Sequence, residues 1–174
     1  IYMSKSFYSL GLMSGTSMDG VDVSIINSDG NAKFKGILNK YFEYSEDLRK
    51  DLISIRNKIN ISKDLTIHLK ELDILQKEIT LFHSKAVNAV VREIDFNIDI
   101  VGFHGQTIFH NADEKISRQL GDGNLLSQLV KKKVVYDFRQ NDLKNGGQGA
   151  PLTPIFHKII SKNIKIEMPL CILN

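Results

Sequence analysis

The fold is decided by the stretch Leu10-Gly11-Leu12-Met13-Ser14-Gly15-Thr16-Ser17-Met18-Asp19-Gly20-Val21-Asp22-Val23-Ser24-Ile25-Ile26. An apolar run that starts at Phe7 predicts one strand, and the alternating run from Val21 to Ile26 predicts a second strand. The cluster of Gly, Ser, Thr and Asp residues between the two runs is typical of a tight turn. We therefore expect a β-hairpin with a polar tip.

The tip of this hairpin has the chemistry of a phosphate site. Glycines such as Gly15 and Gly20 let the backbone take positive φ and approach a ligand closely. The hydroxyls of Ser14, Thr16 and Ser17 and successive backbone N–H groups can face an anion. The simpler alternative is a hairpin turn built from ordinary turn-forming residues.

Two carboxylates beside the tip favour a metal ion. Asp19 and Asp22 are hard oxygen ligands of the kind that hold Mg²⁺ through its waters while the metal binds phosphate oxygens. Gly15 and Gly20 have the spacing of the first two glycines of a P-loop. However, Val21 and Asp22 stand where that motif requires Lys and Ser or Thr, and a strand follows instead of a helix. The sequence thus excludes a Walker-type NTPase.

The composition is typical of one globular domain. The chain has 174 residues, of which 42% are hydrophobic, and no apolar run approaches the roughly 18 residues that a membrane span needs. The single Cys171 excludes an internal disulfide framework, and the start of the chain lacks a signal-peptide pattern, so we expect a cytoplasmic location. The net charge of +3 is spread along the chain without the basic and aromatic stripe that favours nucleic-acid binding.

The hydrophobic period changes from two to 3.6 at Ser45, which predicts helices after a third antiparallel strand over residues 32–44. Ser45 is the expected N-cap of a helix that runs to about Ile61, and a second, long helix is expected from about Ser62. We interpret His68 and His83, which fall within this second stretch, as ordinary helix residues. The apolar stripe of the long helix comprises Leu72, Leu75, Ile79, Phe82, Ala86, Ala89 and Val90.

A short apolar run over residues 98–103 predicts a strand reached by a crossover connection. The segment His104-Gly105-Gln106-Thr107 follows it, and we expect this segment at the carboxyl end of the strand, where open α/β sheets bind ligands. A His and a Gln there could bind sugar hydroxyls, and the plain alternative is a strand-end turn with a capped His. Zinc is disfavoured because His104, His110 and Asp122 lack tight ligand spacing.

The last third of the chain carries further polar turns. A turn at residues 119–124 opens an expected amphipathic helix, and a short strand over residues 134–136 ends at Asp137-Phe138-Arg139. Arg139 can bind a carboxylate or phosphate through two hydrogen bonds, although a simple Asp–Arg surface pair would also explain it. The glycine-rich segment 146–151 precedes a helix that should start at Thr153 and Pro154. The apolar run over residues 170–173 predicts a buried strand.

Four segments occur in an order and approximate spacing that resemble anhydro-N-acetylmuramic acid kinases, a branch of the actin-like ATPase and sugar kinase superfamily. The segments are GLMSGTSMDGVD, VGFHGQT, QLGDGN and VVYDFRQNDLKNGGQGAPLTPIFH. The resemblance runs from Tyr8 to the last residue. It implies an α/β fold of the actin-like ATPase (ribonuclease H-like) type, with a mixed five- or six-stranded sheet flanked by helices.

The resemblance also implies an activity and a site. The γ-phosphate of ATP would be transferred, with Mg²⁺, to 1,6-anhydro-N-acetylmuramic acid, and the ring would open to give the 6-phosphate during cell-wall sugar recycling. The residues matching the ATP phosphate loop are Gly15, Thr16, Ser17, Met18, Asp19, Gly20, Val21 and Asp22, with Asp19 near the metal. Those matching the sugar pocket are His104, Gly105, Gln106, Thr107, Asp122, Arg139, Gly147 and Gln148.

The family pattern continues beyond this sequence with a second phosphate loop, a segment carrying the catalytic aspartate, and a second lobe with the adenosine site. We therefore interpret residues 1–174 as the amino-terminal lobe of a two-lobe sugar kinase, with no catalytic residue of its own. Phosphoryl transfer depends on positioning, so this lobe should need the missing lobe as a partner, or should self-associate. The alternative is a non-catalytic remnant or a sugar- or phosphate-binding module of a truncated gene.

Overall fold

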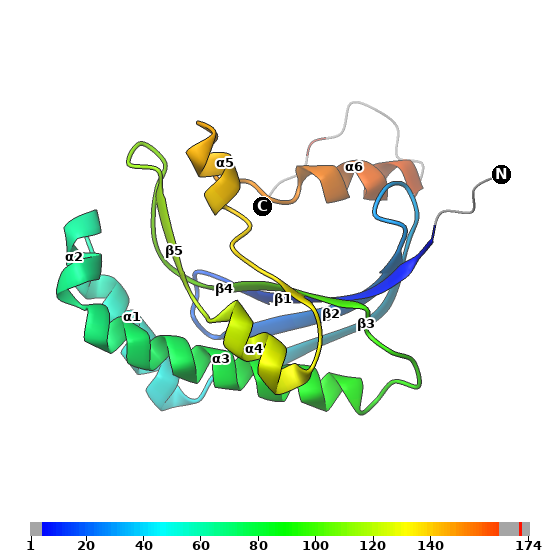
Figure 1. The fold of residues 1–174 in the computed structure, drawn as a ribbon, viewed down its shortest axis with the longest axis horizontal. Coiled ribbons are helices and arrows are strands. Elements are labelled where there is room, and N and C mark those ends of the chain that lie inside the picture. The colour runs from blue at the N-terminus through cyan, green and yellow to red at the C-terminus, as the bar shows by residue number, and fades with distance from the viewer. Residues whose placement is uncertain (1–4, 164–170, 172–174) are drawn as a thin grey trace.

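A mixed sheet separates two sets of helices (Figure 1). The computed structural model describes residues 5–163 and residue 171. Helices α1, α3 and α4 lie on one face of the sheet, and α5 and α6 lie on the opposite side. In chain order the elements are β1 (Phe7–Ser14), β2 (Gly20–Ser28), β3 (Phe34–Glu43), α1 (Glu46–Lys58), α2 (Ser62–Ile67), α3 (Leu69–Val91), β4 (Ile100–Asn111), β5 (Ile116–Leu120), α4 (Gly123–Val130), β6 (Val134–Val135), α5 (Gln140–Lys144) and α6 (Pro154–Asn163).

The sheet combines an antiparallel meander with a parallel strand. Strands β1, β2 and β3 pair antiparallel in sequence order, and β4 pairs parallel with β1. On its other side β4 pairs with β6 over its first half and with β5 over its second half. The six-stranded order β3-β2-β1-β4-β5, with β6 beside β4, confirms the predicted α/β class, the hairpin and the mixed sheet.

The core fills the space between the sheet and α3. Alternate residues of the hairpin, such as Leu10 and Val23, are fully buried and meet the apolar stripe of the helix. Ile79 on α3 and Val101 on β4 are both 0% exposed, which confirms the predicted inward faces of these elements. Full burial of one such side chain contributes about 1.5–3 kcal/mol. Phe82 is half-buried at the edge of this core.

The helical layer differs from the prediction at one point. The hydroxyl of Ser45 accepts a hydrogen bond from the Leu48 N–H at 3.3 Å, which confirms the predicted cap of α1. The stretch after Ser62, however, is not one helix, because the backbone breaks at His68 (φ −99°, ψ 20°) into α2 and α3. Helix α2 has no fully buried residue, and only the half-buried Leu65 packs against the core.

Strand β4 is longer than predicted. We expected the segment His104 to Thr107 beyond a strand end, and this was wrong, because β4 continues to Asn111 and turns back into β5. The segment lies at a β-bulge, where Leu12 pairs with Phe103 but Ser14 pairs with Gln106. Gly105 has φ +74°, and a Cβ there would overlap the carbonyl of Leu120. Only glycine fits this position without strain.

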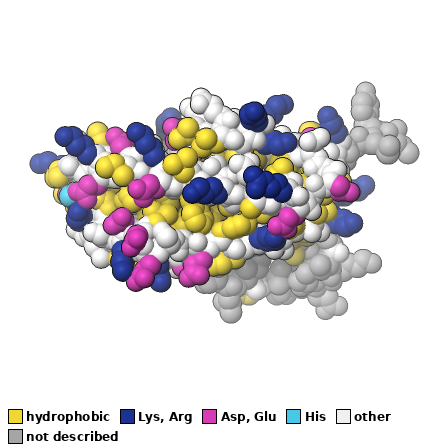
Figure 2. Space-filling model, turned by 90° about the horizontal axis from the view of Figure 1, so that it is seen from below, with side chains coloured by type: hydrophobic (Ala, Val, Ile, Leu, Met, Phe, Trp, Pro, Cys, Tyr) yellow, Lys and Arg dark blue, Asp and Glu magenta, His cyan; other side chains and the backbone are white. Residues whose placement is uncertain are grey.

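The outer face of the helical layer carries exposed hydrophobic side chains. Figure 2 shows them as a band across this face, with Lys, Arg, Asp and Glu around it. Exposed apolar residues of α1 and α3 include Ile53, Ile74 and Leu81. Within the described part of the chain, no helix has the length and hydrophobicity required to cross a membrane. The strand predicted over residues 170–173 lies outside the described residues, except for Cys171, which is exposed.

The two faces of α3 offer a matched test of the core. We expect Ile79→Ala to lower the free energy of unfolding by about 2–5 kcal/mol, because Ile79 is fully buried. The same change at Ile74, which is 60% exposed, should cost less than about 0.5 kcal/mol. Urea unfolding followed by circular dichroism measures both values. Equal losses in the two variants would contradict the orientation of α3.

Candidate functional site

The loop between β1 and β2, residues 15–19, is a tight turn. The N–H of Met18 donates to the carbonyl oxygen of Gly15 at 3.3 Å. Met18 has φ 55°, and its side chain is only 1% exposed. The expectation that glycines supply the positive φ of this turn was therefore wrong. A side chain anchored in the core holds the left-handed conformation instead.

The two glycines of the loop serve different purposes. A Cβ on Gly20 would overlap the carbonyl oxygen of Phe42 and the ring of Tyr41, so close strand packing requires this glycine. Around Gly15 the nearest atom to an added Cβ is the Ser17 hydroxyl at 3.4 Å, an ordinary contact. Nothing within the described chain requires glycine at position 15. The space beside it is open for a ligand.

The exposed side of the loop presents hydrogen-bond donors and one carboxylate. The N–H groups of Thr16 and Ser17 make no hydrogen bond to any described residue. The Ser17 hydroxyl donates to Asp19 at 2.6 Å, and this bond is the main reason that the pKa of the Asp19 carboxyl is lowered. The positive charge of Arg49 also favours the ionised form. Asp19 is therefore a carboxylate at neutral pH.

Two further carboxylates lie near the loop, Asp22 on β2 and Glu43 on β3. Tyr41 pairs directly with Asp22 across β2 and β3. The pKa of Tyr41 is raised, first by partial desolvation and then by the negative charges of Asp19, Glu43 and Asp22. In the part of the chain that the structure describes, no group of three or more His, Cys, Asp or Glu side chains is arranged to hold a metal ion.

Gln106 connects β4 to the loop. Its side-chain Nε2 donates to the carbonyl oxygen of Gly15 at 2.8 Å, and the residue is 0% exposed. Its Oε1 is buried. Among the described residues, it is the one buried side-chain nitrogen or oxygen atom that has no hydrogen-bond partner. The bulge at Gly105 makes this contact possible, because it places Gln106 beside Ser14. Gln106, predicted as a sugar ligand, thus touches the loop itself.

His104 and Arg139 form a second cluster. His104 Nδ1 donates to the Gly105 carbonyl at 2.8 Å, so Nε2 is left to accept from Arg139 Nη2 at 2.9 Å. Burial and the Arg139 charge both lower the pKa of His104, so the imidazole is neutral. Arg139 Nη1 donates to the carbonyl oxygen of Gly149 at 2.6 Å. The arginine fork therefore joins β4 to the glycine-rich loop.

The glycine-rich loop is folded around Asp142. The carboxylate of Asp142 accepts from the Gly149 N–H at 2.7 Å, and its carbonyl accepts from the Gly147 N–H at 2.8 Å. A Cβ on Gly147 would overlap this carboxylate, which explains the glycine there. Gln148, which lies between Gly147 and Gly149, is exposed. These contacts fix the Gly149 carbonyl that Arg139 binds.

Two other predicted sugar residues make local contacts. The carboxylate of Asp122 accepts from the Leu125 N–H at 2.9 Å and caps α4, while its own N–H donates to the Thr80 hydroxyl of α3. The hydroxyl of Thr107 accepts from Gln119 at 3.3 Å. These contacts join Asp122 to helices α3 and α4. Direct sugar contacts by these residues stay predictions.

A cavity of about 660 Å³ brings the two predicted sets of residues together. It lies against the sheet face opposite α3, with Phe156 of α6 on its far side. Asp22 from the phosphate-loop set and His104 from the sugar set both line it, and much of the remaining wall is apolar. The other lining residues are Gly11, Leu12, Met13, Ser24, Gly102, Phe138, Leu152, Thr153 and Phe156.

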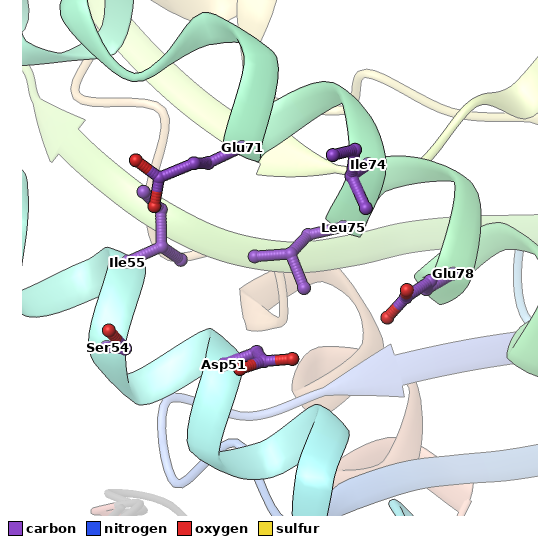
Figure 3. A pocket seen from close by; sticks show the side chains of 7 residues that line it. All are labelled: Asp51, Ser54, Ile55, Glu71, Ile74, Leu75 and Glu78. Carbon is purple, nitrogen blue, oxygen red and sulfur yellow. The ribbon is translucent and has the colours of Figure 1, made fainter.

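A smaller pocket of about 170 Å³ lies in the helical layer, between α1 and α3 (Figure 3). Ile55 and Leu75 form its apolar part, and Asp51, Glu71 and Glu78 surround it. Glu71 already pairs with Lys58 at 2.6 Å. This pocket lies in the helical layer, whereas the larger cavity is on the opposite side of the sheet, and none of the predicted site residues lines the smaller pocket.

Tyr44 and His83 both support the loop, and the sequence did not lead us to either of them. The Ser14 hydroxyl lies 2.9 Å from the Tyr44 hydroxyl and 3.1 Å from His83 Nε2, and all three side chains are buried. His83 is therefore more than the ordinary helix residue we expected. A signal was present, since His83 lies four residues after Ile79 on the apolar stripe of α3. A histidine inside such a stripe needs a buried partner.

The fold and the loop define the class of protein. The mixed six-stranded sheet, with helices on both sides and a polar hairpin tip, makes this an α/β lobe. The particular family follows from sequence comparison. The family model described as "Anhydro-N-acetylmuramic acid kinase" matches residues 7–173, and the chain belongs to that family.

Curated relatives agree with this family. The anhydro-N-acetylmuramic acid kinase of Pelagibacter ubique (strain HTCC1062) is 57% identical over 172 residues, which cover 99% of this chain and 46% of the relative. The protein of the same name from Agrobacterium fabrum is 37% identical over 170 residues, covering 95% of this chain and 46% of the relative. The chain thus spans about half the length of the curated relatives it matches.

Among solved structures, an activator of 2-hydroxyisocaproyl-CoA dehydratase from Clostridium difficile with bound ADPNP aligns with 98% of this chain and 66% of its own. The TM-score is 0.34 and the identity 14%, a similarity too low to support any argument about this chain.

The buried His83 predicts a dependence of stability on pH. Burial lowers the pKa of His83 from 6.5 to about 4. Between these values the unfolded chain binds a proton that the folded chain does not, so stability falls as the pH drops from about 6.5 to about 4. The loss attributable to His83 is roughly 3 kcal/mol. Urea unfolding at several pH values measures it.

His83→Gln should flatten this part of the pH profile, because glutamine does not titrate. His104, whose pKa is also lowered by burial, should account for part of the slope that remains in His83→Gln. A wild-type profile in His83→Gln would show that His83 is not buried as described.

Proposed function

We propose that this chain supplies the phosphate-loop half of an ATP-dependent anhydro-N-acetylmuramic acid kinase. The substrates would be ATP, water and 1,6-anhydro-N-acetylmuramic acid. The γ-phosphate would go to the sugar O6, water would add at C1 as the anhydro bridge opens, and ADP and N-acetylmuramic acid 6-phosphate would leave. Because ATP is a cytoplasmic metabolite, we propose a cytoplasmic enzyme that recycles a peptidoglycan sugar.

One observation carries the proposal: the loop at residues 15–19 is held rigidly but leaves its donors open. Thr16 and Ser17 have N–H groups without partners among the described residues, and Gly15 leaves free space beside them. Successive N–H groups in such a turn bind anions well. Met13 and Asp22, on the strands that lead into and out of the loop, line a cavity together with His104, so a phosphate on the loop would lie near a bound sugar.

Asp19 fits a role beside Mg²⁺. Its carboxyl is ionised, and Ser17 orients it, so it can accept a hydrogen bond from a metal-bound water or bind the metal directly. No described trio of ligands would hold the ion alone, so phosphate oxygens of ATP would complete its coordination. When bound, Mg²⁺ would neutralise charge on the transferred phosphoryl group. Asp22 lies on the cavity side of the same hairpin.

The cavity fits an amino sugar in size and character. A volume of about 660 Å³ exceeds that of one sugar ring with its substituents, and ligand pockets are typically apolar with a few polar groups. Phe138 and Phe156 can face the apolar side of a ring, while the N–H groups of Arg139 that bind neither His104 nor Gly149 can face hydroxyl or carboxylate groups. Gly147, Gln148 and Thr107 would extend this surface.

The chain should need the other half of its family pattern for turnover. Phosphoryl transfer requires both substrates to be held in line, and this half offers no group that we can place as the base. We expect no measurable phosphorylation of 1,6-anhydro-N-acetylmuramic acid by the 174-residue chain alone. Mixing it with the remaining half of the Pelagibacter ubique relative should restore activity, measured as ATP-dependent formation of the 6-phosphate.

This experiment also separates the alternatives. Turnover by the isolated monomer would show that nothing essential is missing from it. No turnover after complementation, with both halves folded and associated, would favour a non-catalytic remnant or a binding module. The complete Pelagibacter ubique enzyme is the positive control for the assay.

Two substitutions test the loop in the complemented enzyme. Gly15→Val fills the ligand space, and Asp19→Ala removes the metal-side carboxylate. Each should lower kcat/KM for ATP by about 100-fold or more, since several kcal/mol are lost at a charged site. Gly36→Val is the matched control, because Gly36 is exposed and has no atom within 4 Å of an added Cβ. Wild-type turnover and magnesium dependence in Gly15→Val would refute the assignment.

A further inference from the structure

The loop at residues 15–19 is tied to the core by a chain of three buried side chains. Ser14, the last residue of β1, is 1% exposed and lies between Tyr44 and His83. Tyr44 follows β3, and His83 lies in the middle of α3. These three hydrogen-bonded side chains therefore join β1, the end of β3 and α3 at the point where the loop begins.

The direction of each hydrogen bond follows from its chemistry. His83 Nδ1 lies 2.7 Å from the carbonyl oxygen of Ile79, which can only accept, so Nδ1 carries the proton. Nε2 of the neutral ring must then accept, and the Ser14 hydroxyl donates to it at 3.1 Å. Because the Ser14 proton is used, the Tyr44 hydroxyl donates to Ser14 Oγ at 2.9 Å. Each of the three side-chain donors, on Tyr44, Ser14 and His83, therefore has a defined acceptor.

Tyr44 also holds the other end of the loop. Its backbone N–H donates to the carbonyl oxygen of Asp19 at 2.8 Å, while its side chain binds Ser14. One residue therefore spans the mouth of the loop. The Tyr44 ring packs edge-on against Phe82 with centroids 4.8 Å apart, and the His83 ring packs against Phe103 at 4.9 Å. Each ring of the pair therefore packs against an aromatic neighbour as well as making its hydrogen bonds.

We propose that His83 and Tyr44 are positioning residues for the loop, acting through the Ser14 hydroxyl. They touch neither the cavity nor the exposed donors, so their effect on a ligand would be indirect. They fix where the loop starts and ends and thus the direction of the Thr16 and Ser17 N–H groups. The claim that a phosphate is what these groups bind rests on the proposed function, but the positioning itself does not.

Local amide hydrogen exchange in the 174-residue chain tests the positioning without any ligand. The amides of Met18 and Tyr44 report on the loop because both make hydrogen bonds within it. We expect Tyr44→Phe and His83→Leu to speed their exchange roughly three- to tenfold, the effect of losing one hydrogen bond. Amides of Val23 and Ile25 in β2 should change far less.

Two further variants separate positioning from general stability. His83→Gln offers Ser14 an acceptor again and should restore slow exchange at Met18. Tyr8→Phe is the matched control, since Tyr8 stacks on Phe96 at 4.1 Å and its hydroxyl makes no hydrogen bond to the described residues. Unchanged loop exchange in folded Tyr44→Phe would overturn the proposal, and so would equal acceleration throughout β2. Tyr44→Phe loses only a hydroxyl, so it remains informative if His83→Leu does not fold.

Binding of inorganic tripolyphosphate with Mg²⁺, measured by calorimetry, then separates this inference from the proposed function. If the wild-type chain binds tripolyphosphate and Tyr44→Phe binds it at least about threefold more weakly, the positioning of the loop by Tyr44 also strengthens phosphate binding. Equal affinity in the two proteins would overturn that extension. If the wild-type chain does not bind, the phosphate role of the loop loses support, and the exchange rates alone decide whether His83 and Tyr44 position it.

Discussion

The parallel pairing of β1 with β4 is the contact on which the site depends. Strand β1 leads into the loop, and β4 carries His104 and Gln106. One extra residue in β4 between the pairs Leu12–Phe103 and Ser14–Gln106 changes which side chains share a face. A shift of one residue reverses the faces of a strand, so the bulge leaves His104 on the cavity side and turns Gln106 toward the loop.

Local patterns were sufficient to predict most of the fold. The alternation around Val21 to Ile26 and the stripe of α3 reflect burial on one face, which each segment records in its own sequence. The cap at Ser45 is equally local, since its side chain binds a backbone N–H three residues later. The resemblance of four motifs then supplied the family, which sequence comparison confirmed.

The wrong predictions share a physical cause. In each one, the conformation or the partner of a residue depends on contacts with parts of the chain that are distant in sequence. Gly105 is needed because of the Leu120 carbonyl on a neighbouring strand, and no local pattern shows that a strand will continue through a glycine and a bulge. Met18, instead of a glycine, takes positive φ because its side chain is buried in a core that other elements complete. His83 finds its partner Ser14 across 69 residues of sequence.

These distant contacts explain why the loop can be open and still have a defined shape. Short exposed turns usually fluctuate, because few buried contacts oppose the entropy of the free chain. Here the backbone atoms that face inward are satisfied by Gln106 and Tyr44, and the side chain of Met18 is in the core. The ordering of the loop is therefore achieved when the core folds and not when a ligand binds. A site prepared in this way loses less free energy on binding, because its entropy cost has already been met.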